Sequence, residues 1–222
     1  SAKNRKLEYI SYKSTTDEAN CYVETKLFIS ALYDADTSDE LLSDLIIRSA
    51  LSSNFSLENR LRRILRNLQE KRSLYFDKKD NFGIIESSSD KELEPEKINL
   101  FIDRSNQLID LLEEIETDSK LERLLEYLNI AFDGNEIIHL CIWTENVSTA
   151  EYIWAALDDI IPTVYLVSAK TSLEDRVKGI SEFKKNGGIQ IMTDAYSEGV
   201  DLPFVDECIN YDLPKNDLVM EN

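Results

Sequence analysis

The sequence has few residues that could build a metal site or a disulfide framework. Its 222 residues include three cysteines and one histidine, His139. The cysteines, at positions 21, 141 and 208, are odd in number and widely spaced, and no Cys-x-x-Cys pair occurs. This pattern disfavours zinc or disulfide scaffolds and predicts free thiols in a reducing cytoplasm, with Cys141 and Cys208 in buried strands. We expect His139, at a strand start, to be structural rather than a metal ligand.

Long apolar runs and phosphate-binding loops are also missing. No run approaches the ~20 apolar residues that cross a bilayer, and the N-terminus has no basic-then-apolar signal peptide. We therefore expect a cytoplasmic protein without a membrane partner. The chain has no G-x-x-x-x-G-K-[ST] loop for a nucleoside triphosphate and Mg²⁺. Ser197 has no nearby histidine, which disfavours an autonomous small-molecule enzyme and leaves no catalytic residue to assign.

Positive charge is scarce. The chain carries 25 Lys+Arg against 43 Asp+Glu, a formal net charge of −18. Residues 119–222 alone hold 8 basic and 19 acidic residues, a net of −11. Phosphate neutralisation dominates nucleic-acid affinity, so we expect no tight autonomous binding of DNA or RNA. The charge is compatible with a partial groove whose basic wall lies in another domain, or with an acidic surface that meets a protein partner.

The chain divides into two parts of different pattern. Residues 1–117 predict an all-α segment, with helices over 40–51, along Leu57–Leu68 and over 98–115, and a linker over 78–95. The polar face of the second helix carries four arginines: Arg60, Arg62, Arg63 and Arg66. In residues 118–222 the order α-β-α-β-α-β-β, with short connections, predicts a mostly parallel sheet covered on both faces. The fold class is therefore α/β, preceded by an all-α segment.

Capping patterns predict where three helices begin. Thr37, Ser119 and Thr171 are each followed three residues later by Glu, as in a capping box. After Thr171 we expect an inward-facing stripe of apolar residues: Leu173, Val177, Ile180 and Phe183.

The most informative stretch is Ile189–Pro214, IQIMTDAYSEGVDLPFVDECINYDLP. A short apolar strand runs into Thr193, a polar loop with one glycine follows, and a second strand ends at Asp212. In open α/β sheets ligands bind at the carboxyl ends of strands, and glycine lets the backbone approach a ligand closely. The alternative is an ordinary acidic connection between two strands.

This stretch resembles motif V of superfamily 2 helicases and translocases, nearest to the Swi/Snf-like and related bacterial DEAD/DEAH-type members. The matching residues stand in the family's order: Thr193, Asp194, Glu198, Gly199, Asp201, Leu202, Tyr211, Asp212 and Pro214. The resemblance implies a C-terminal RecA-like lobe over residues 118–222, incomplete before motif VI. It extends to residues 48–68, whose S-A-L-S-S segment is similar to one between the lobes of related proteins, so that residues 1–117 form a helical inter-lobe segment.

The same resemblance implies roles for individual residues of motif V. Thr193 falls where relatives hold a nucleic-acid phosphate, and Asp201 where they contact the nucleotide ribose or relay its state. Glu198 helps to couple the two sites, and Gly199 permits close approach. The alternative is that the acidic side chains only satisfy loop amides.

Two further segments resemble neighbouring parts of that lobe. CIWTENVSTAEYI looks like motif IV, which places Thr144 and Asn146 near the nucleic-acid backbone; the alternative is that Asn146 only caps a helix. In VSAKTSLEDR, the side chains of Ser168, Lys170 and Arg176 either touch nucleic acid or only cap the following helix. Many relatives have glycine where this chain has Ala169.

Together these features predict the C-terminal lobe of an ATP-dependent nucleic-acid helicase or translocase. ATP and Mg²⁺ would bind through an N-terminal RecA-like lobe in cis, DNA or RNA would cross both lobes, and the lobe would be inactive alone. The alternative function is a nucleotide-independent, acidic protein-interaction module on an α/β scaffold.

Overall fold

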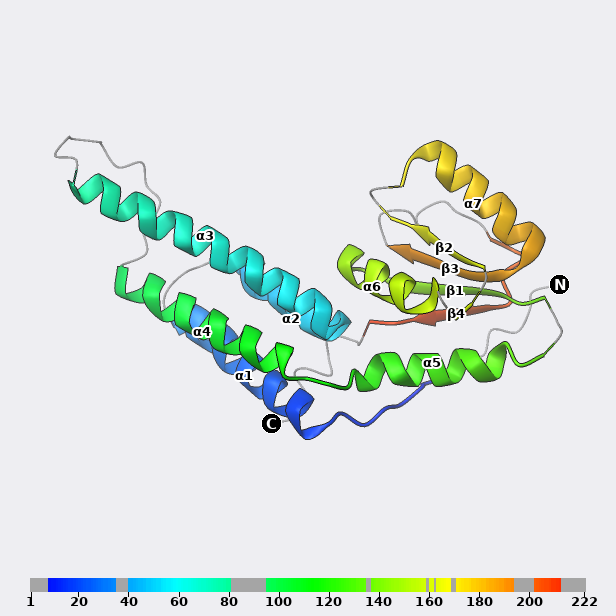
Figure 1. The fold of residues 1–222 in the computed structure, drawn as a ribbon, viewed down its shortest axis with the longest axis horizontal. Coiled ribbons are helices and arrows are strands. Elements are labelled where there is room, and N and C mark those ends of the chain that lie inside the picture. Colours follow the sequence, from blue (N-terminus) through cyan, green and yellow to red (C-terminus); the bar gives the residue numbers. More distant parts are fainter. Residues whose placement is uncertain are drawn as a thin grey trace.

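The computed structural model describes residues 8–34, 40–80, 95–134, 137–158, 160–161, 163–168, 171–193 and 202–212. Within these residues helices come first and a sheet follows (Figure 1). The elements are α1 (Thr16–Asp34), α2 (Glu40–Ser52), α3 (Asn54–Asp80), α4 (Pro95–Glu113), α5 (Ser119–Ala131), β1 (His139–Thr144), α6 (Val147–Asp158), β2 (Val164–Val167), α7 (Leu173–Asn186), β3 (Gly188–Thr193) and β4 (Glu207–Asn210).

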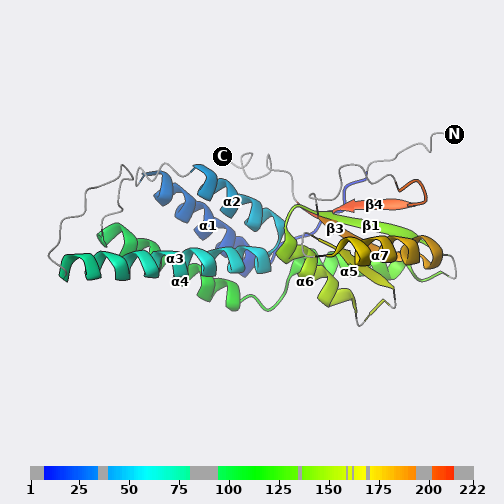
Figure 2. The same ribbon diagram turned by 90° about the horizontal axis from the view of Figure 1, so that it is seen from above.

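Helices α1 to α4 share one hydrophobic core. The stripe predicted on α3 is buried at Leu57, Leu61, Ile64 and Leu68, because residues three and four apart share one face of a helix. α4 lies beside α3 in both views (Figures 1 and 2). The sequence pattern did not predict helix α1, because Thr25 interrupts its buried apolar face. The Thr25 hydroxyl donates to the Cys21 carbonyl at 2.8 Å.

The four strands form one parallel sheet in the order β2-β3-β1-β4. Helices α5 and α6 lie on one side of the sheet and α7 on the other (Figure 1). Side chains alternate accordingly: Leu140 and Ile142 of β1 share a core with α5 and α6, whereas Cys141 packs with Phe183 of α7. The predicted α/β fold class, a parallel sheet flanked by helices and preceded by an all-α segment, is confirmed.

The exposure of Cys208 differs from the prediction. β4 borders the described sheet on one side only, so its residues alternate between half-buried and exposed, and Cys208 is exposed. Cys141 is buried directly opposite it in the register. The contact with Cys208, together with burial, raises the pKa of the Cys141 thiol. Both cysteines are free thiols, as predicted.

Two of the predicted helix starts are one residue off, and the third lies outside the described residues, at Thr37. Asp118, not Ser119, caps α5, and its carboxylate accepts from the Leu121 amide at 2.9 Å. Ser119 instead donates its hydroxyl to Glu18 at 2.7 Å. Ser172, not Thr171, caps α7.

The predicted inward stripe of α7 is wrong for two of its four residues. Phe183 is buried, but Leu173 and Val177 are 73% and 62% exposed. Only the C-terminal part of this helix therefore contributes a large side chain to the core. The linker predicted over 78–95 is also too long, because α3 continues to Asp80 and α4 begins at Pro95; residues 81–94 lie outside the described part.

Among the described residues no helix combines the length and apolar character that a bilayer crossing requires.

Candidate functional site at the carboxyl edge of the sheet

Thr144 and Thr193 lie side by side at the carboxyl ends of two neighbouring strands. They are the last register partners of the parallel pair β1–β3. Both are 1% exposed. Counting back in steps of two places them on the sheet face of Ile142 and Ile191, which is the face covered by α5 and α6. The threonines predicted from motif IV and motif V are thus brought together by strand pairing alone.

Asp212 joins this edge from β4. The backbone amide of Tyr211 donates to the carbonyl of Trp143 at 2.8 Å, which continues the β4–β1 pairing by one residue. Asp212 then accepts from the Thr144 hydroxyl at 2.9 Å and, through its other oxygen, from the Glu145 amide. The carboxylate therefore fixes the turn that leaves β1.

Hydroxyl groups from the helical segment reach the same carboxylate. The Ser52 hydroxyl donates to Asp212 at 2.7 Å and lies 2.7 Å from the Thr149 hydroxyl, which is 2.8 Å from that of Ser53. Each hydroxyl has one proton to donate, so the protons can run from Ser53 through Thr149 and Ser52 to Asp212, with Thr144 as a second donor. We call these five residues the hydroxyl–carboxylate network.

Lys120 lies next to the hydroxyl–carboxylate network and contacts the end of α2. Its ammonium group donates to the carbonyls of Leu51 and Ser52, at 2.8 and 2.6 Å, and lies 4.1 Å from the centre of the Tyr211 ring. A cation at the C-terminal carbonyls of α2 is favourable, because these groups carry the negative end of the helix dipole. Burial lowers the pKa of Lys120 to about 8, against the attraction of Asp212 and Asp118.

Further contacts tie the helical segment to the α/β part around this edge. Arg48 of α2 forms an ion pair with Glu145 at 2.8 Å. Phe55 of α3 stacks on Tyr152 of α6, with ring centres 5.2 Å apart. The Tyr152 hydroxyl in turn donates to Asp118 at 3.0 Å. The corner between α2 and α3 is therefore seated against the sheet edge rather than loosely attached.

The structure gives the remaining predicted residues different surroundings. Asn146 caps α6: its side chain accepts from the Ser148 amide at 3.1 Å, and its carbonyl from the Ala150 amide at 3.0 Å. The Thr193 hydroxyl has no hydrogen-bond partner among the described residues. Four other residues lie outside the described part: Lys170, Glu198, Gly199 and Asp201.

Thr144, in contrast to Thr193, uses its hydroxyl inside the protein. It donates to Asp212 and accepts from the Asn146 amide at 3.2 Å. In this arrangement Thr144 shapes the loop after β1, and its contact with nucleic acid stays a prediction. Sequence reasoning missed Ser52, Ser53 and Thr149, because nothing in the S-A-L-S-S segment tells which residues will receive its hydroxyl groups.

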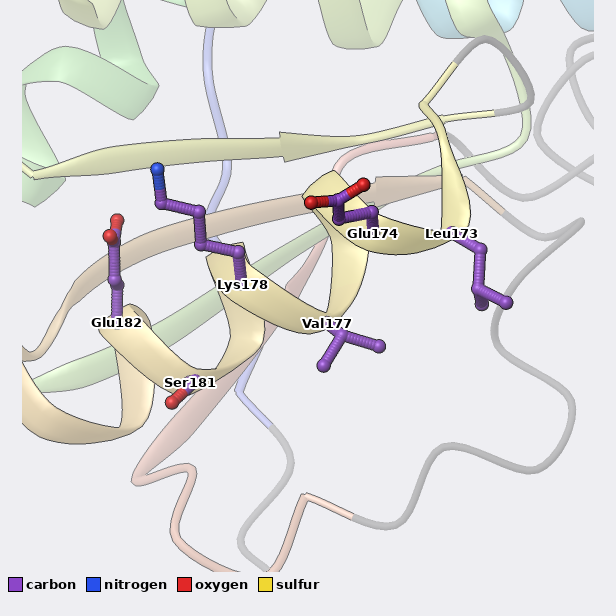
Figure 3. A pocket seen from close by; sticks show the side chains of 6 residues that line it. All are labelled: Leu173, Glu174, Val177, Lys178, Ser181 and Glu182. Carbon is purple, nitrogen blue, oxygen red and sulfur yellow. The ribbon is translucent and has the colours of Figure 1, made fainter.

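Two other features of the described residues do not add to this site. No group of three or more His, Cys, Asp or Glu side chains in that part of the chain could hold a metal ion. A hollow of about 840 Å³ lies on the outer face of α7 (Figure 3). Its described lining is Leu173, Glu174, Val177, Lys178, Ser181 and Glu182, so Thr144, Asn146 and Thr193 take no part in it.

The second part of the chain is similar to known proteins. Residues 119–221 match the helicase conserved C-terminal domain. Over 68 residues the chain is 32% identical to DEAD-box ATP-dependent RNA helicase 22 of Oryza sativa subsp. japonica. The aligned region covers 31% of this chain and 12% of that protein.

Solved structures resemble a longer part of the chain. The Hef helicase domain of Pyrococcus furiosus superposes with a TM-score of 0.59 and 14% identity, covering 98% of this chain and 51% of that one. The C-terminal part of the Fun30 ATPase domain gives a TM-score of 0.46 at 14% identity, covering 96% and 77%. The chain thus spans about half the length of the Hef domain and a small fraction of the rice helicase. Residues 119–221 match the helicase conserved C-terminal domain, and the fold of the chain is similar to that of the Hef helicase domain, in agreement with the predicted RecA-like lobe.

Proposed function

We propose that this chain is the C-terminal lobe of an ATP-dependent nucleic-acid helicase or translocase. In this proposal ATP and Mg²⁺ bind in the cleft between this lobe and an N-terminal RecA-like lobe of the same protein. DNA or RNA crosses both lobes, and closing and opening of the cleft moves the strand. The chain contributes motif IV and motif V and hydrolyses no ATP on its own.

The observation that carries the proposal is the pairing of Thr144 with Thr193 at the carboxyl edge of the parallel sheet. Ligands of open α/β sheets bind at this edge. The Thr193 hydroxyl has no hydrogen-bond partner in the described part of the chain, which supports a role as a phosphate donor. Thr144 supports that role indirectly, because its bond to Asp212 shapes the adjoining loop.

The nucleotide side of the proposal concerns residues 198–201. Glu198 and Gly199 would link the nucleotide cleft to the phosphate contact, and the Asp201 carboxylate would accept a ribose hydroxyl proton. Asn146 and Lys170 would lie along the nucleic-acid backbone beside Thr193. These roles follow from the motif order and from the family match of residues 119–221.

The test is an ATPase assay on the full-length protein, with and without single-stranded or duplex DNA and RNA. Wild type is compared with Thr193→Val and Asp201→Ala. We expect one nucleic acid to stimulate turnover, Thr193→Val to weaken that stimulation, and Asp201→Ala to lose it. The purified chain of 222 residues serves as a control and should show no turnover.

A well-folded full-length protein without ATPase activity under any of these conditions would overturn the proposal. That result would favour the acidic protein-interaction module, since the net charge of −18 suits a basic protein partner. Robust turnover by the 222-residue chain alone would contradict the assignment of ATP binding to another lobe.

A further inference from the structure

Helix α3 carries arginines that form no ion pair with the carboxylates of the described residues. Arg63 and Arg66 are exposed, and Arg60 is half-buried. The three follow one another at intervals of three residues, which places consecutive side chains side by side on the helix surface, with Cβ atoms roughly 5–6 Å apart. Among the described residues none of them forms an ion pair. We call these residues the arginine stripe.

Neighbouring arginines show that this absence is not the rule for the chain. Arg62, on the same helix, pairs with Glu58 at 2.7 Å and with Glu113 of α4. Arg48 pairs with Asp44 at 2.6 Å and with Glu145 at 2.8 Å. The protein has 43 acidic residues against 25 basic ones, and yet the described part of the chain supplies these three arginines with no acidic partner.

The surroundings of Arg60 favour the binding of an anion. Its guanidinium donates one hydrogen bond, a long one of 3.4 Å, to the Ser49 hydroxyl. Burial lowers the pKa of Arg60, and the positive charge of Arg63 lowers it further. An anion bridging the two guanidinium groups would relieve both effects, since planar guanidinium groups bind phosphate through paired hydrogen bonds.

We propose that Arg60, Arg63 and Arg66 form a second contact site for the nucleic-acid backbone, on the helical segment outside the α/β lobe. The inference rests on the proposed function and extends it, by giving a chain of net charge −18 a local basic contact surface. Phosphate is the favoured ligand, because repeated phosphates match arginines that repeat along a helix.

The stripe is connected to the sheet edge through helix α2. Ser49, which receives the Arg60 hydrogen bond, lies one turn before Ser52 of the hydroxyl–carboxylate network. Arg48 on the same turn reaches Glu145, at the end of β1. A strand held at Thr193 and at the stripe would therefore contact β3 and α3, and α2 links α3 to the end of β1, the neighbour of β3.

The experiment measures binding of fluorescein-labelled single-stranded and duplex oligonucleotides to the full-length protein across a range of salt concentrations. The main variant is Arg63→Gln/Arg66→Gln, because both side chains are exposed and their loss leaves the core intact. We expect weaker binding, by about tenfold, for every sequence tested. The slope of log K against log salt should fall by about 1.4 to 1.8, the value for two lost phosphate contacts.

Arg62→Gln is the matched control, since it removes an equal charge from the same helix at a position already paired with two carboxylates. The affinity of this variant for the oligonucleotides, and its salt slope, should stay close to those of wild type. Arg60→Gln should act like the main variant, with its folding checked by circular dichroism. ATPase activity without nucleic acid should not change in any of these variants.

The outcomes separate this inference from the proposed function. If Arg63→Gln/Arg66→Gln leaves affinity and salt slope unchanged while Thr193→Val weakens binding, the stripe is not a contact site and the proposed function stands. Equal weakening by Arg62→Gln would indicate a general charge effect and would also overturn the stripe. If the wild-type protein binds no DNA or RNA, the proposed function fails and the inference fails with it.

Discussion

Ser52 is the residue through which the helical segment reaches the sheet edge. Replacing it by alanine removes one of the donors to Asp212 and one hydrogen-bond partner of the Thr149 hydroxyl. Groups that lose partners in a buried site destabilise a protein by roughly 1–3 kcal/mol. We therefore expect Ser52→Ala to lower the free energy of unfolding by about 2 kcal/mol, as measured by urea denaturation.

Ser56 offers a matched control one turn further along the chain. It is equally buried, but its hydroxyl has no hydrogen-bond partner among the described residues. Ser56→Ala should therefore leave stability unchanged or raise it slightly, because only an unsatisfied group is removed. Equal losses for the two alanine variants would mean that the network contributes nothing beyond packing.

Lys120 should make stability depend on pH. Its pKa is about 8 in the folded protein, against 10.5 as the ordinary value. Between these values the unfolded chain holds more protons than the folded one, so the free energy of unfolding rises with pH. Below pH 8 the folded protein bears the penalty of a buried charge, which amounts to roughly 3 kcal/mol at most.

The measurement compares wild type with Lys120→Met and Lys120→Arg by chemical denaturation between pH 7 and 10.5. Neither replacement titrates in this range. The unfolding free energy of wild type minus that of each variant should therefore increase as the pH rises. Groups that titrate alike in all three proteins cancel in the difference. A difference that stays flat across the range would show that Lys120 keeps an ordinary pKa.

At the scale of elements, strand β3 begins at a glycine that no other residue can replace without strain. Gly188 has φ 105°, and a Cβ at this position would lie 2.2 Å from the carbonyl oxygen of Thr163. We expect Gly188→Ala to destabilise the protein by roughly 3 kcal/mol or more, through backbone strain and this clash. Thermal denaturation measures the effect.

Gly179, in the middle of α7, is the opposite case and the control. The nearest atom to a Cβ there is Cδ1 of Tyr165, at 4.0 Å. Alanine is the better helix former by about 1 kcal/mol, so Gly179→Ala should raise the melting temperature. Destabilisation by Gly179→Ala would indicate that the position tolerates no side chain, contrary to the free space that this distance indicates.

Local patterns predicted most elements, because they repeat with the period of the structure that they form. The buried faces of α3 and α4 and the fully buried β3 were visible as apolar spacing. Exact helix starts were not, since Asp118 and Ser119 are both good caps, and distant Glu18 determines which of them is free to act. Spacing also predicted burial for Leu173, which none of the described residues covers.

The candidate site was predictable only in part. The order of motif residues along the chain predicted Thr193, and parallel pairing explains why Thr144 lies next to it. Ser52 could not be predicted, because it meets Asp212 across 160 residues of sequence. Contacts of this range depend on how the helical segment docks, which no local pattern encodes.

At the scale of the whole molecule, two hydrophobic cores are joined by a polar seam. One core lies among α1–α4 and the other between the sheet and helices α5 and α6. The seam consists of the hydroxyl–carboxylate network, Lys120 and the stack of Phe55 on Tyr152. We expect the two cores to unfold together in wild type, because opening the seam exposes buried polar groups.

A triple variant tests this coupling: Ser52→Ala/Lys120→Met/Phe55→Ala. It removes one contact of each kind and leaves both cores untouched. Calorimetry should show one transition for wild type and two for the variant, with the van't Hoff enthalpy of each falling below the total calorimetric enthalpy. A single transition at a lower temperature would indicate that the cores are coupled by other contacts.

The single non-helical residue between α2 and α3, Ser53, has a mechanical consequence. It sits at the sheet edge, and from it α3 extends over 27 residues, about 40 Å at 1.5 Å per residue. Because α3 shares one core with α1, α2 and α4, a rotation at this corner would move the helical segment as a unit. A rotation of about 5° would carry the far end of α3 through about 3.5 Å over that length, so a small rearrangement around Asp212 would be enlarged along the helix.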